Sequence, residues 1–357
     1  MLDRCSIKLL ELTINWCTWD ELLKRTGAPP SSIYWHLRRL IRCGMVEARG
    51  RRRLRYRATL KGVLLCINLG CGGSVERAAQ ELGISLIEAD AVGKAFFRIV
   101  QYMSLVDKFR RIFMRRGRAI ILAYDHGIEH GPTDFMDNEK SADPAYIIDI
   151  AVKLGFDGLV LQRGLAEKYY GGQIPLILKL NGKTSLYSGE PISVANCTVE
   201  EAISLGASAV GYTIYAGSGL EYKMFEELSR IKKDAVKFDV PLVVWSYPRG
   251  SKVKDEQSPE VVAYAARIAL ELGADAMKIK YTGDPKTFSW AVKVAGKVPV
   301  LMSGGPKTKT DEEFLKQVEG VIMAGGSGIA VGRNVWQRTD PFAIGESIKR
   351  IVYPREG

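Results

Sequence analysis

Two lysines near the end of an apolar segment are the side chains best suited to covalent chemistry. Lys278 and Lys280 are two residues apart in the segment DAMKIKY, so the alternation of a strand places them on the same face. Burial and a neighbouring cation both favour the neutral amine, which attacks carbonyl groups to form an imine. Spacing alone does not decide which lysine is the nucleophile, and either one could instead cap the strand in solvent.

Acid–base groups end two other apolar segments. Asp125 ends the segment 119–125, and Tyr247 ends the segment 241–247 with Trp245 two residues before it. Imine chemistry on a carbonyl substrate needs a carboxylate and a proton-carrying hydroxyl beside the amine. These residues therefore predict such a site, provided that the fold brings the ends of the segments together.

Two glycine-containing turns follow later apolar segments and predict a phosphate site. Backbone N–H groups of such turns and helix N-termini bind phosphate oxygens, and a guanidinium adds bidentate contact. The turns are Ser303-Gly304-Gly305, before a helix expected to begin near Thr310, and Gly332-Arg333.

A metal centre is the weaker interpretation of the histidines. His126 and His130 lie four residues apart, and Asp125 or Glu129 could complete a ligand set. We predict neither a metal nor another cofactor, because a lysine imine already supplies the electron sink that a metal would provide.

Eight short apolar runs alternating with amphipathic segments must position these residues. This count is that of a (β/α)8 TIM barrel, whose reactive groups lie at the carboxyl ends of the strands, whereas a doubly wound sheet better explains six strands. A helix over 105–118 is expected to close the bottom of the barrel. The predicted strands are 119–125, 158–162, 175–180, 208–214, 241–247, 275–281, 298–303 and 328–332.

The net charge of +11 over 357 residues is concentrated in the first part of the chain. Residues 1–104 hold 17 Lys and Arg against 9 Asp and Glu, whereas residues 105–357 hold 34 against 31. A hydrophobic content of 46% excludes a disordered or collagen-like chain, and no apolar run approaches the roughly 18 residues of a membrane span. Five of the six cysteines lie in residues 1–104 without metal-site spacing. We expect a cytoplasmic protein with buried thiols.

We predict an α/β fold in which a small winged helix-turn-helix domain, residues 1–69, precedes the barrel. Thr18 caps a helix from Trp19 to Arg25, Gly27 and two prolines break the pattern, and a second helix is expected over 31–42. Strand-like segments 45–49 and 54–59 then form a hairpin wing. We predict a helical connector over 70–104 and a barrel domain over 105–357.

Nucleic-acid binding is the predicted role of this domain, since a second helix of this kind enters the major groove and the wing contacts the backbone. A winged fold that makes only protein contacts, with its arginines solvated, is the alternative. The candidate contacts to duplex DNA are Ser32, Trp35, Arg38, Arg39, Arg51, Arg52 and Arg53.

The barrel segments resemble the archaeal-type class I fructose-bisphosphate aldolases over essentially all of 105–357. The resemblance implies reversible cleavage of fructose 1,6-bisphosphate into glyceraldehyde 3-phosphate and dihydroxyacetone phosphate, in glycolysis or gluconeogenesis. It also implies a homo-oligomer, since family members are often decamers. The motifs that carry it are AIILAYDHGIEHG (119–131), LILKLNGKTSLY (176–187), LVVWSYPRG (242–250), ADAMKIKYTGDPKTFSWAV (274–292), VLMSGGPKTKT (300–310) and AVGRNVWQR (330–338).

The resemblance also assigns roles. The Schiff-base lysine of the family falls on Lys278, Asp125 matches the aspartate that assists the carbinolamine and imine steps, and Tyr247 matches the proton-transferring tyrosine. Trp245 matches the aromatic residue that shapes the site. The two glycine-containing turns match the phosphate-binding turns.

Two alternative functions remain open at this point. A dideoxy-amino-heptulosonate synthase shares the Asp-His-Gly sequence and the imine lysine, although Trp245 and Tyr281 are more similar to the aldolase. A transcriptional regulator that senses a sugar phosphate through an aldolase barrel would combine both parts of the chain. Family members generally begin near the equivalent of residue 105, so the resemblance says nothing of the first 104 residues.

Overall fold

The computed structural model divides the chain into two compact units, residues 1–104 and 105–357, which are described separately. In the first unit the structure describes residues 17–27, 33, 37, 40, 41, 46–49 and 55–58, and in the second it describes residues 105–354.

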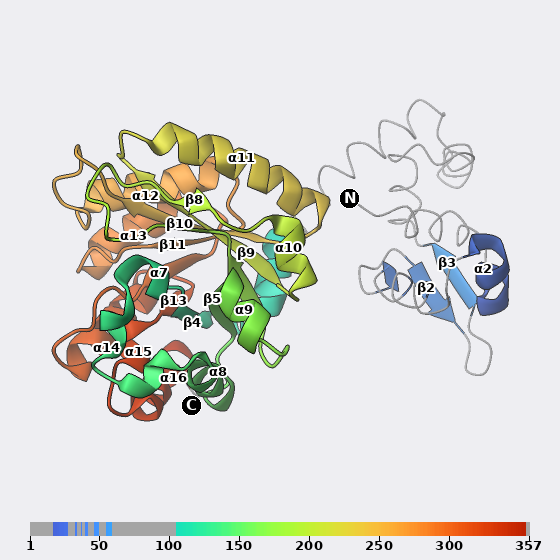
Figure 1. Ribbon diagram of the computed structural model, residues 1–357, viewed down its shortest axis with the longest axis horizontal. Helices are drawn as coiled ribbons and strands as arrows, with labels where there is room; N and C mark the ends of the chain where they lie inside the picture. Colours follow the sequence, from blue (N-terminus) through green and yellow to red (C-terminus); the bar gives the residue numbers. More distant parts are fainter. Residues whose placement is uncertain are drawn as a thin grey trace. The chain divides into compact units, whose positions relative to one another are not determined.

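The second unit is a closed barrel of eight parallel strands in sequential order, with the last strand pairing with the first (Figure 1). The predicted TIM barrel is therefore confirmed. Each strand lies within a few residues of its predicted position. The strands are β4 (Ala119–Tyr124), β5 (Gly158–Gln162), β6 (Leu176–Lys179), β9 (Ala209–Ala216), β10 (Leu242–Pro248), β11 (Ala276–Ile279), β12 (Val300–Ser303) and β13 (Gly328–Val331).

A helix follows each strand and covers the outside of the barrel (Figure 1). These helices are α8 (Pro144–Lys153), α9 (Arg163–Tyr169), α10 (Val199–Ser204), α11 (Glu221–Lys237), α12 (Pro259–Glu271), α13 (Pro285–Val294), α14 (Asp311–Met323) and α16 (Pro341–Val352). Shorter elements interrupt the connections: α7 (Gly127–His130), η1 (Pro132–Phe135), η2 (Glu139–Ala142), α15 (Arg333–Trp336) and the hairpin of β7 (Asn181–Gly182) with β8 (Val194–Ala195). Among the described residues, no helix is long and apolar enough to cross a membrane.

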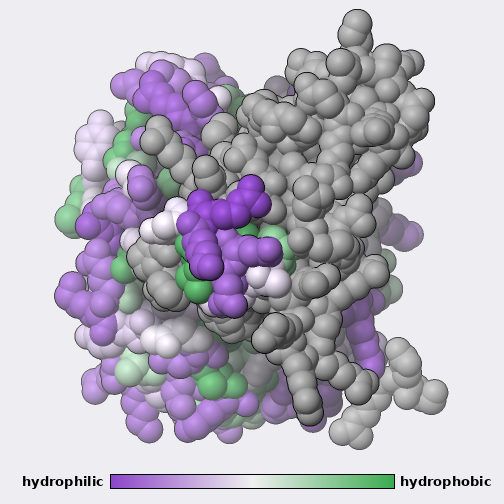
Figure 2. Space-filling model, turned by 90° about the vertical axis from the view of Figure 1, so that its right-hand side faces the viewer, coloured by the Kyte–Doolittle hydropathy of each residue, from purple (hydrophilic) through white to green (hydrophobic). Residues whose placement is uncertain are grey.

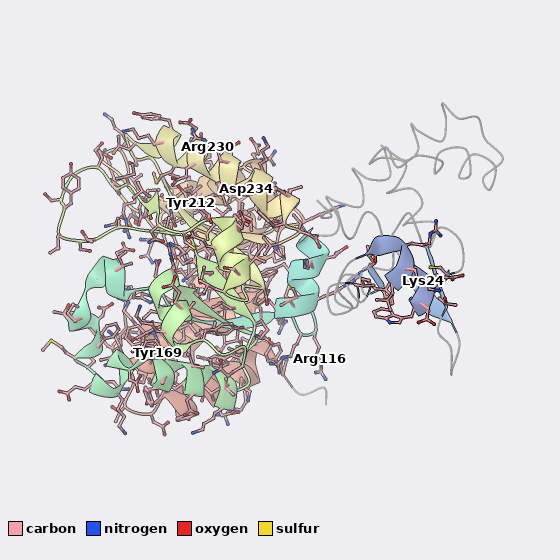
Figure 3. The ribbon with its side chains drawn as sticks, turned by 45° about the vertical axis from the view of Figure 1, so that its right-hand side comes forward. Lys24, Arg116, Tyr169, Tyr212, Arg230 and Asp234 are labelled. Carbon is pink, nitrogen blue, oxygen red and sulfur yellow. The ribbon has the colours of Figure 1, made fainter. Side chains whose placement is uncertain are left out.

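Helix α11 shows how the sequence pattern directs each helix onto the barrel. Met224, Leu228, Ile231 and Ala235 recur at helical spacing and are all buried. Figure 3 shows Arg230 on the outer side of this helix. On the face of the molecule in Figure 2, hydrophilic side chains predominate among the described residues. The apolar residues thus form a core between strands and helices, and a second core inside the barrel.

The bottom of the barrel is closed by a helix, as predicted, but this helix is shorter than expected. It ends at residue 113 instead of 118, because Arg116 and Gly117 adopt positive φ angles of 50° and 75° in a turn that pairs Arg115 with Arg118. Phe109 and Phe113 stack with ring centroids 5.0 Å apart and pack into the core inside the barrel. Side chains fill this end of the barrel, so a ligand site can form only at the other end, where the strands have their carboxyl ends.

The first unit contains α2 (Trp19–Thr26), which begins at the predicted cap. Thr18 and Glu21 form a reciprocal capping box, and Gly27 ends the helix in the left-handed conformation. Strand β3 (Arg55–Ala58) pairs antiparallel with both β2 (Val46–Arg49) and β1 (Cys17–Thr18). The short strand β1 was not predicted.

Only part of the predicted second helix is described. Ile33, Leu37 and Leu40 are helical and buried, at the spacing of one helix face. The seven candidate DNA contacts, the tip of the hairpin and the connector 70–104 lie outside the described residues.

Candidate active site

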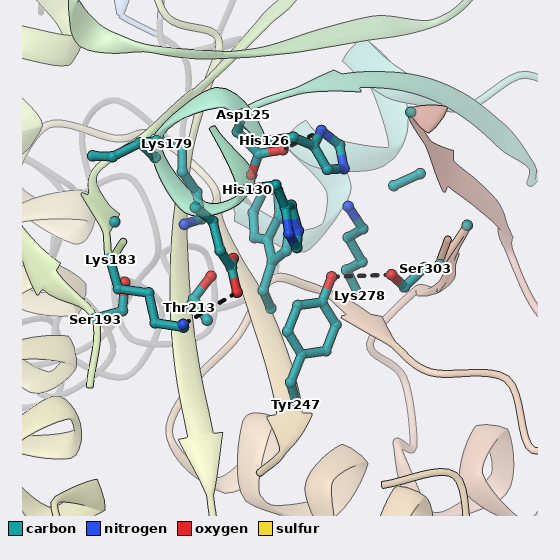
Figure 4. Close-up of a pocket in the computed structure, with 18 of the residues that line it drawn as sticks. Asp125, His126, His130, Lys179, Lys183, Ser193, Thr213, Tyr247, Lys278 and Ser303 are labelled. Atoms are coloured by element: carbon teal, nitrogen blue, oxygen red, sulfur yellow. Dashed lines mark hydrogen bonds and ion pairs between the residues drawn. The ribbon is translucent and has the colours of Figure 1, made fainter. Parts of the chain in front are cut away.

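A cavity of about 260 Å³ opens at the carboxyl ends of the barrel strands (Figure 4). All eight strands, or the residues that directly follow them, contribute to its lining. The structure brings together in this cavity all nine residues that the sequence predicted for catalysis and phosphate binding: Asp125, Trp245, Tyr247, Lys278, Ser303, Gly304, Gly305, Gly332 and Arg333.

Lys278 is the most buried cationic group of the predicted set, with 3% of its surface exposed. Alternation along β11 turns its side chain into the barrel together with that of Ala276. Its Nζ lies 5.4 Å from the centroid of the Trp245 ring. Burial lowers the pKa of Lys278, the Asp125 carboxylate opposes this effect, and the Arg333 charge adds to it. The balance leaves the amine easier to deprotonate than an ordinary lysine.

Lys280 also lines the cavity, but its surroundings differ from those of Lys278. Its Nζ forms an ion pair with the Glu256 carboxylate, and its side chain is 23% exposed. The ion pair with Glu256 engages the Lys280 amine, whereas the Lys278 amine faces the cavity. Of the two lysines that spacing alone could not separate, the structure therefore favours Lys278 as the amine nucleophile.

Asp125 directly follows β4 and faces the cavity (Figure 4). Burial raises the pKa of Asp125, but the charge of Lys278, and then those of His126 and Lys179, outweigh burial and hold this pKa below its ordinary value. Asp125 is therefore an anion at neutral pH. Burial also lowers the pKa of His126 to about 3, so the imidazole, whose Nδ1 lies 3.7 Å from Asp125 Oδ1, is neutral.

The Tyr247 hydroxyl lies at the cavity wall and donates a hydrogen bond of 3.2 Å to Ser303 Oγ (Figure 4). Burial raises the pKa of Tyr247 well above its ordinary value, while the Ser303 hydrogen bond lowers it and the Asp125 charge raises it. The phenol consequently keeps its proton and can pass it to a reacting oxygen or carbon.

Trp245 lies beneath the amines of Lys278 and Lys179 in the cavity, with 2% of its surface exposed. Its ring passes so close to Gly211 on β9 that a Cβ there would lie 2.4 Å from Trp245 Cζ3. Only glycine leaves room for the indole at this register position. The position of Trp245 thus depends on a residue 34 positions earlier in the sequence.

Replacing Gly211 with alanine should displace Trp245. Overpacking of this kind costs about 1–3 kcal/mol of unfolding free energy. We expect a lower melting temperature and a lower kcat, measured by thermal unfolding and steady-state kinetics. Gly164→Ala on α9, where an added Cβ meets nothing within 4 Å, is the matched control. Equal effects of the two substitutions would contradict the assigned contact.

Asn334 braces the predicted phosphate turn and was missed by the sequence reasoning. Its Nδ2 donates to the carbonyl oxygens of Gly304 and Pro306, each at 2.8 Å, and its Oδ1 accepts from Thr308 N at 2.9 Å. The asparagine is fully buried. The amide holds the turn open toward the cavity, where the backbone of Gly304 and Gly305 is exposed to a ligand.

Arg333 brings positive charge to the same side of the cavity. Its Nη1 lies 3.7 Å from Asp134 Oδ2, and its buried Nε has no hydrogen-bond partner within the described part of the chain. The predicted helix near Thr310 does begin there, as α14 with Thr310 as its cap, but its first turn carries three acidic residues and is absent from the cavity lining. The phosphate-binding contribution predicted for that helix terminus is therefore not supported.

A second group of cations lies on the opposite side of the cavity. Arg249 pairs with Glu129 through Nη1 at 2.9 Å and with Glu256 through Nε at 3.1 Å. Lys183 Nζ lies 3.6 Å from Glu129 Oε1 (Figure 4). Sequence reasoning did not select Arg249, although it lies two residues beyond Tyr247 and faces the same side of the chain.

Lys179 is a second buried lysine that the sequence reasoning did not select. Its Nζ donates to the backbone oxygen and to Oδ1 of Asn181, both at 2.9 Å, and lies 5.6 Å from the Trp245 ring centroid. Burial lowers the pKa of Lys179 to about 8. The sequence signal that could have identified Lys179 is a charged residue inside the apolar run LILKL. Because Asn181 occupies its amine, Lys179 is less available for attack on a carbonyl than Lys278.

The comparisons with known proteins agree with this geometry. A family model described as DeoC/LacD family aldolase matches residues 119–338. The chain is 77% identical over 250 residues to the class 1 fructose-bisphosphate aldolase of Thermoproteus tenax, covering 70% of this chain and 95% of that protein. It is 48% identical over 242 residues to the class 1 fructose-bisphosphate aldolase of Halobacterium salinarum, covering 67% of this chain and 92% of that protein.

A solved structure is similar to this chain at nearly the same sequence identity as the Thermoproteus tenax enzyme. It is that of an archaeal fructose-1,6-bisphosphate aldolase whose catalytic lysine is covalently bound to the carbinolamine intermediate of the substrate. The two sequences are 76% identical with a TM-score of 0.69, and the match covers 70% of this chain and 99% of that chain. The chain therefore belongs to the class 1 fructose-bisphosphate aldolases within the DeoC/LacD aldolase family.

Proposed function

We propose that the barrel cleaves fructose 1,6-bisphosphate reversibly into glyceraldehyde 3-phosphate and dihydroxyacetone phosphate through an imine on Lys278. The observation that carries this proposal is a buried lysine of lowered pKa facing an anionic carboxylate and a protonated phenol in one cavity. A coupled cleavage assay on the purified full chain tests it. Turnover should persist in the presence of chelator, and negligible cleavage of this substrate would refute it.

Lys278, Asp125 and Tyr247 would each carry out a different part of the reaction. The neutral Lys278 amine attacks the C2 carbonyl carbon, and the carbinolamine loses water as protons move through Asp125 and Tyr247. The protonated imine then accepts the electron pair of the C3–C4 bond, while the C4 hydroxyl gives its proton to the Tyr247 oxygen, which lost its own proton in the dehydration step. Protonation at C3 by Tyr247 and hydrolysis of the imine release the second product and restore the amine.

The two cationic sides of the cavity support a substrate with a phosphate at each end. The turn Gly304–Gly305 with Arg333 would hold one phosphate, and Arg249 with Lys183 would hold the other. Lys278 lines the same cavity as both groups of cations. A sugar held by its two phosphates would therefore present its carbonyl group to the Lys278 amine.

The rate of imine formation should depend on pH through Lys278, since only the neutral amine attacks. Asp125→Asn removes the anion that raises the pKa of Lys278. We expect the pH at which borohydride trapping reaches half its maximal rate to move to lower values. Asp137→Asn, which changes an exposed carboxylate paired with Lys307, should leave that pH unchanged. A shift to higher pH in Asp125→Asn would refute the assigned coupling.

We propose that residues 1–69 form a winged helix-turn-helix domain that binds duplex DNA, joined by the connector 70–104 to the barrel domain 105–357. The capped helix α2 followed by helical, buried positions at Ile33, Leu37 and Leu40 supports this proposal. So does the antiparallel sheet in which β3 lies between β1 and β2. The excess of basic residues in 1–104 gives the charge that nucleic-acid phosphates require.

A salt titration of duplex binding by the full chain tests this role. Changing Arg51, Arg52 and Arg53 to serine should weaken binding to all sequences and reduce the slope of log affinity against log salt by about 2.7. Binding that is absent even at low salt would refute the role. An affinity that changes with fructose 1,6-bisphosphate, in a chain with negligible cleavage activity, would instead favour a sugar-phosphate-sensing regulator.

We also propose that the protein works in the cytoplasm as a homo-oligomer. Cys197 is buried and forms no disulfide with another described residue, as expected in a reducing compartment.

A further inference from the structure

Three cations at one side of the catalytic cavity are joined to two carboxylates in a single network. Arg249 lies in the middle, with Nη1 2.9 Å from Glu129 Oε1 and Nε 3.1 Å from Glu256 Oε1. Lys183 Nζ lies 3.6 Å from the same oxygen of Glu129, and Lys280 pairs with Glu256. Three positive charges thus face two negative charges, which leaves the network with a net charge of +1.

Arg249 is held by partners from three different parts of the barrel. Glu129 reaches it from α7, and Glu256 reaches it from the loop between β10 and α12. The centroid of the Tyr215 ring, on β9, lies 5.2 Å from the guanidinium carbon. The two carboxylates therefore both orient the guanidinium and neutralise its charge.

A phosphate that binds at Arg249 must compete with these carboxylates. Guanidinium and ammonium groups use the same N–H donors for carboxylate and for phosphate oxygens, so Glu129 and Glu256 engage donors that the phosphate needs. Arg249 and Lys183 line both the catalytic cavity and a neighbouring cavity of about 540 Å³, and of these two cavities Glu256 lines only the neighbouring one. A carboxylate displaced from Arg249 thus has space on the side away from the reacting groups.

We propose that Glu129 and Glu256 are positioning residues that make phosphate binding at Arg249 an exchange of anions. The carboxylates orient the guanidinium, and the phosphate then replaces them as its partner. Because the phosphate must displace an anion, it binds less tightly, which favours release of the phosphorylated product from this end of the cavity. The inference rests on the proposed substrate, whose second phosphate would contact Arg249 and Lys183.

Binding of inorganic phosphate to the full chain tests the exchange without requiring catalysis. Glu129→Gln keeps the shape and a hydrogen-bond acceptor but removes the competing charge, so calorimetry should show phosphate binding about tenfold tighter than in the wild type. Glu226→Gln on α11, which changes an exposed carboxylate paired with Arg230, is the control and should not change the affinity. Adding Arg249→Met to Glu129→Gln should abolish the gain, because the effect acts through the guanidinium.

Steady-state kinetics test the same exchange on the substrate. Glu129→Gln and Glu256→Gln should each lower KM for fructose 1,6-bisphosphate several-fold without raising kcat, since tighter binding at this end slows release. Of the two monophosphates, fructose 1-phosphate and fructose 6-phosphate, only the one whose phosphate lies at Arg249 should bind more tightly. A merely structural role of the two carboxylates would instead weaken the binding of both monophosphates.

The outcomes separate this inference from the proposed function. Unchanged phosphate affinity in Glu129→Gln, or a gain that persists after Arg249→Met is added, would overturn the exchange even in a chain that cleaves fructose 1,6-bisphosphate. The expected gain in phosphate affinity in a chain with negligible cleavage would support the exchange at Arg249 and refute the proposed substrate.

Discussion

Lys278→Met will abolish the covalent adduct that borohydride traps in the presence of fructose 1,6-bisphosphate and will lower kcat/KM at least about 1,000-fold. The physical reason is that methionine fills a similar volume within the barrel but has no amine. Lys278 combines burial, a position in the cavity over Trp245 and a lowered pKa. The adduct is located by mass spectrometry of the digested protein.

Lys280→Met is the matched control, since it makes the same change two residues along the chain. Lys280 is already paired with Glu256, so its loss should leave the adduct in place, with a smaller effect that reflects the altered charge of the cavity. An adduct on Lys280 or Lys179 in the wild type would show that the nucleophile is misassigned. Absence of any adduct, together with loss of activity on chelation, would exclude the imine mechanism itself.

Tyr247→Phe will lower kcat about 100- to 10,000-fold, the range expected for loss of a positioned proton-transfer group. Because the amine of Lys278 and the Asp125 carboxylate remain, the variant should still form the imine, at a lower rate, and borohydride should still trap the substrate. The hydroxyl lost is the one that donates to Ser303 across the cavity. Single-turnover kinetics separate imine formation from carbon–carbon bond cleavage.

Tyr215→Phe provides the comparison, because Tyr215 pairs in register with Tyr247 on the neighbouring strand and also lines the cavity. Its ring lies 5.2 Å from the Arg249 guanidinium, and phenylalanine keeps that ring. We expect a change in kcat of less than about tenfold. Equal losses in the two variants would indicate a general disturbance of the site and not proton transfer by Tyr247.

Much of the barrel could be predicted from the sequence because parallel strands covered on both faces are continuous apolar runs bounded by glycine and proline. The carboxyl ends of such strands meet at one end of a barrel, so Asp125, Tyr247 and Lys278 could be placed in one site without coordinates. The helix before the first strand was predicted too long, because the positive φ angle of Arg116 ends it in a turn that no residue-type signal announced.

The sequence by itself determined the order of the barrel elements, the candidates for the reactive side chains and the division of charge between the two parts of the chain. These features depend on local periodicity and composition. Only the tertiary structure decided which lysine is buried without an ion-pair partner. Lys280 forms an ion pair with Glu256, which lies in a loop 24 residues earlier in the sequence. The tertiary structure also decided how Asn334 braces the turn at Gly304 and how Gly211 makes room for Trp245. Such contacts depend on the register of neighbouring strands and on the path of the loops, which alternation along a single segment does not specify.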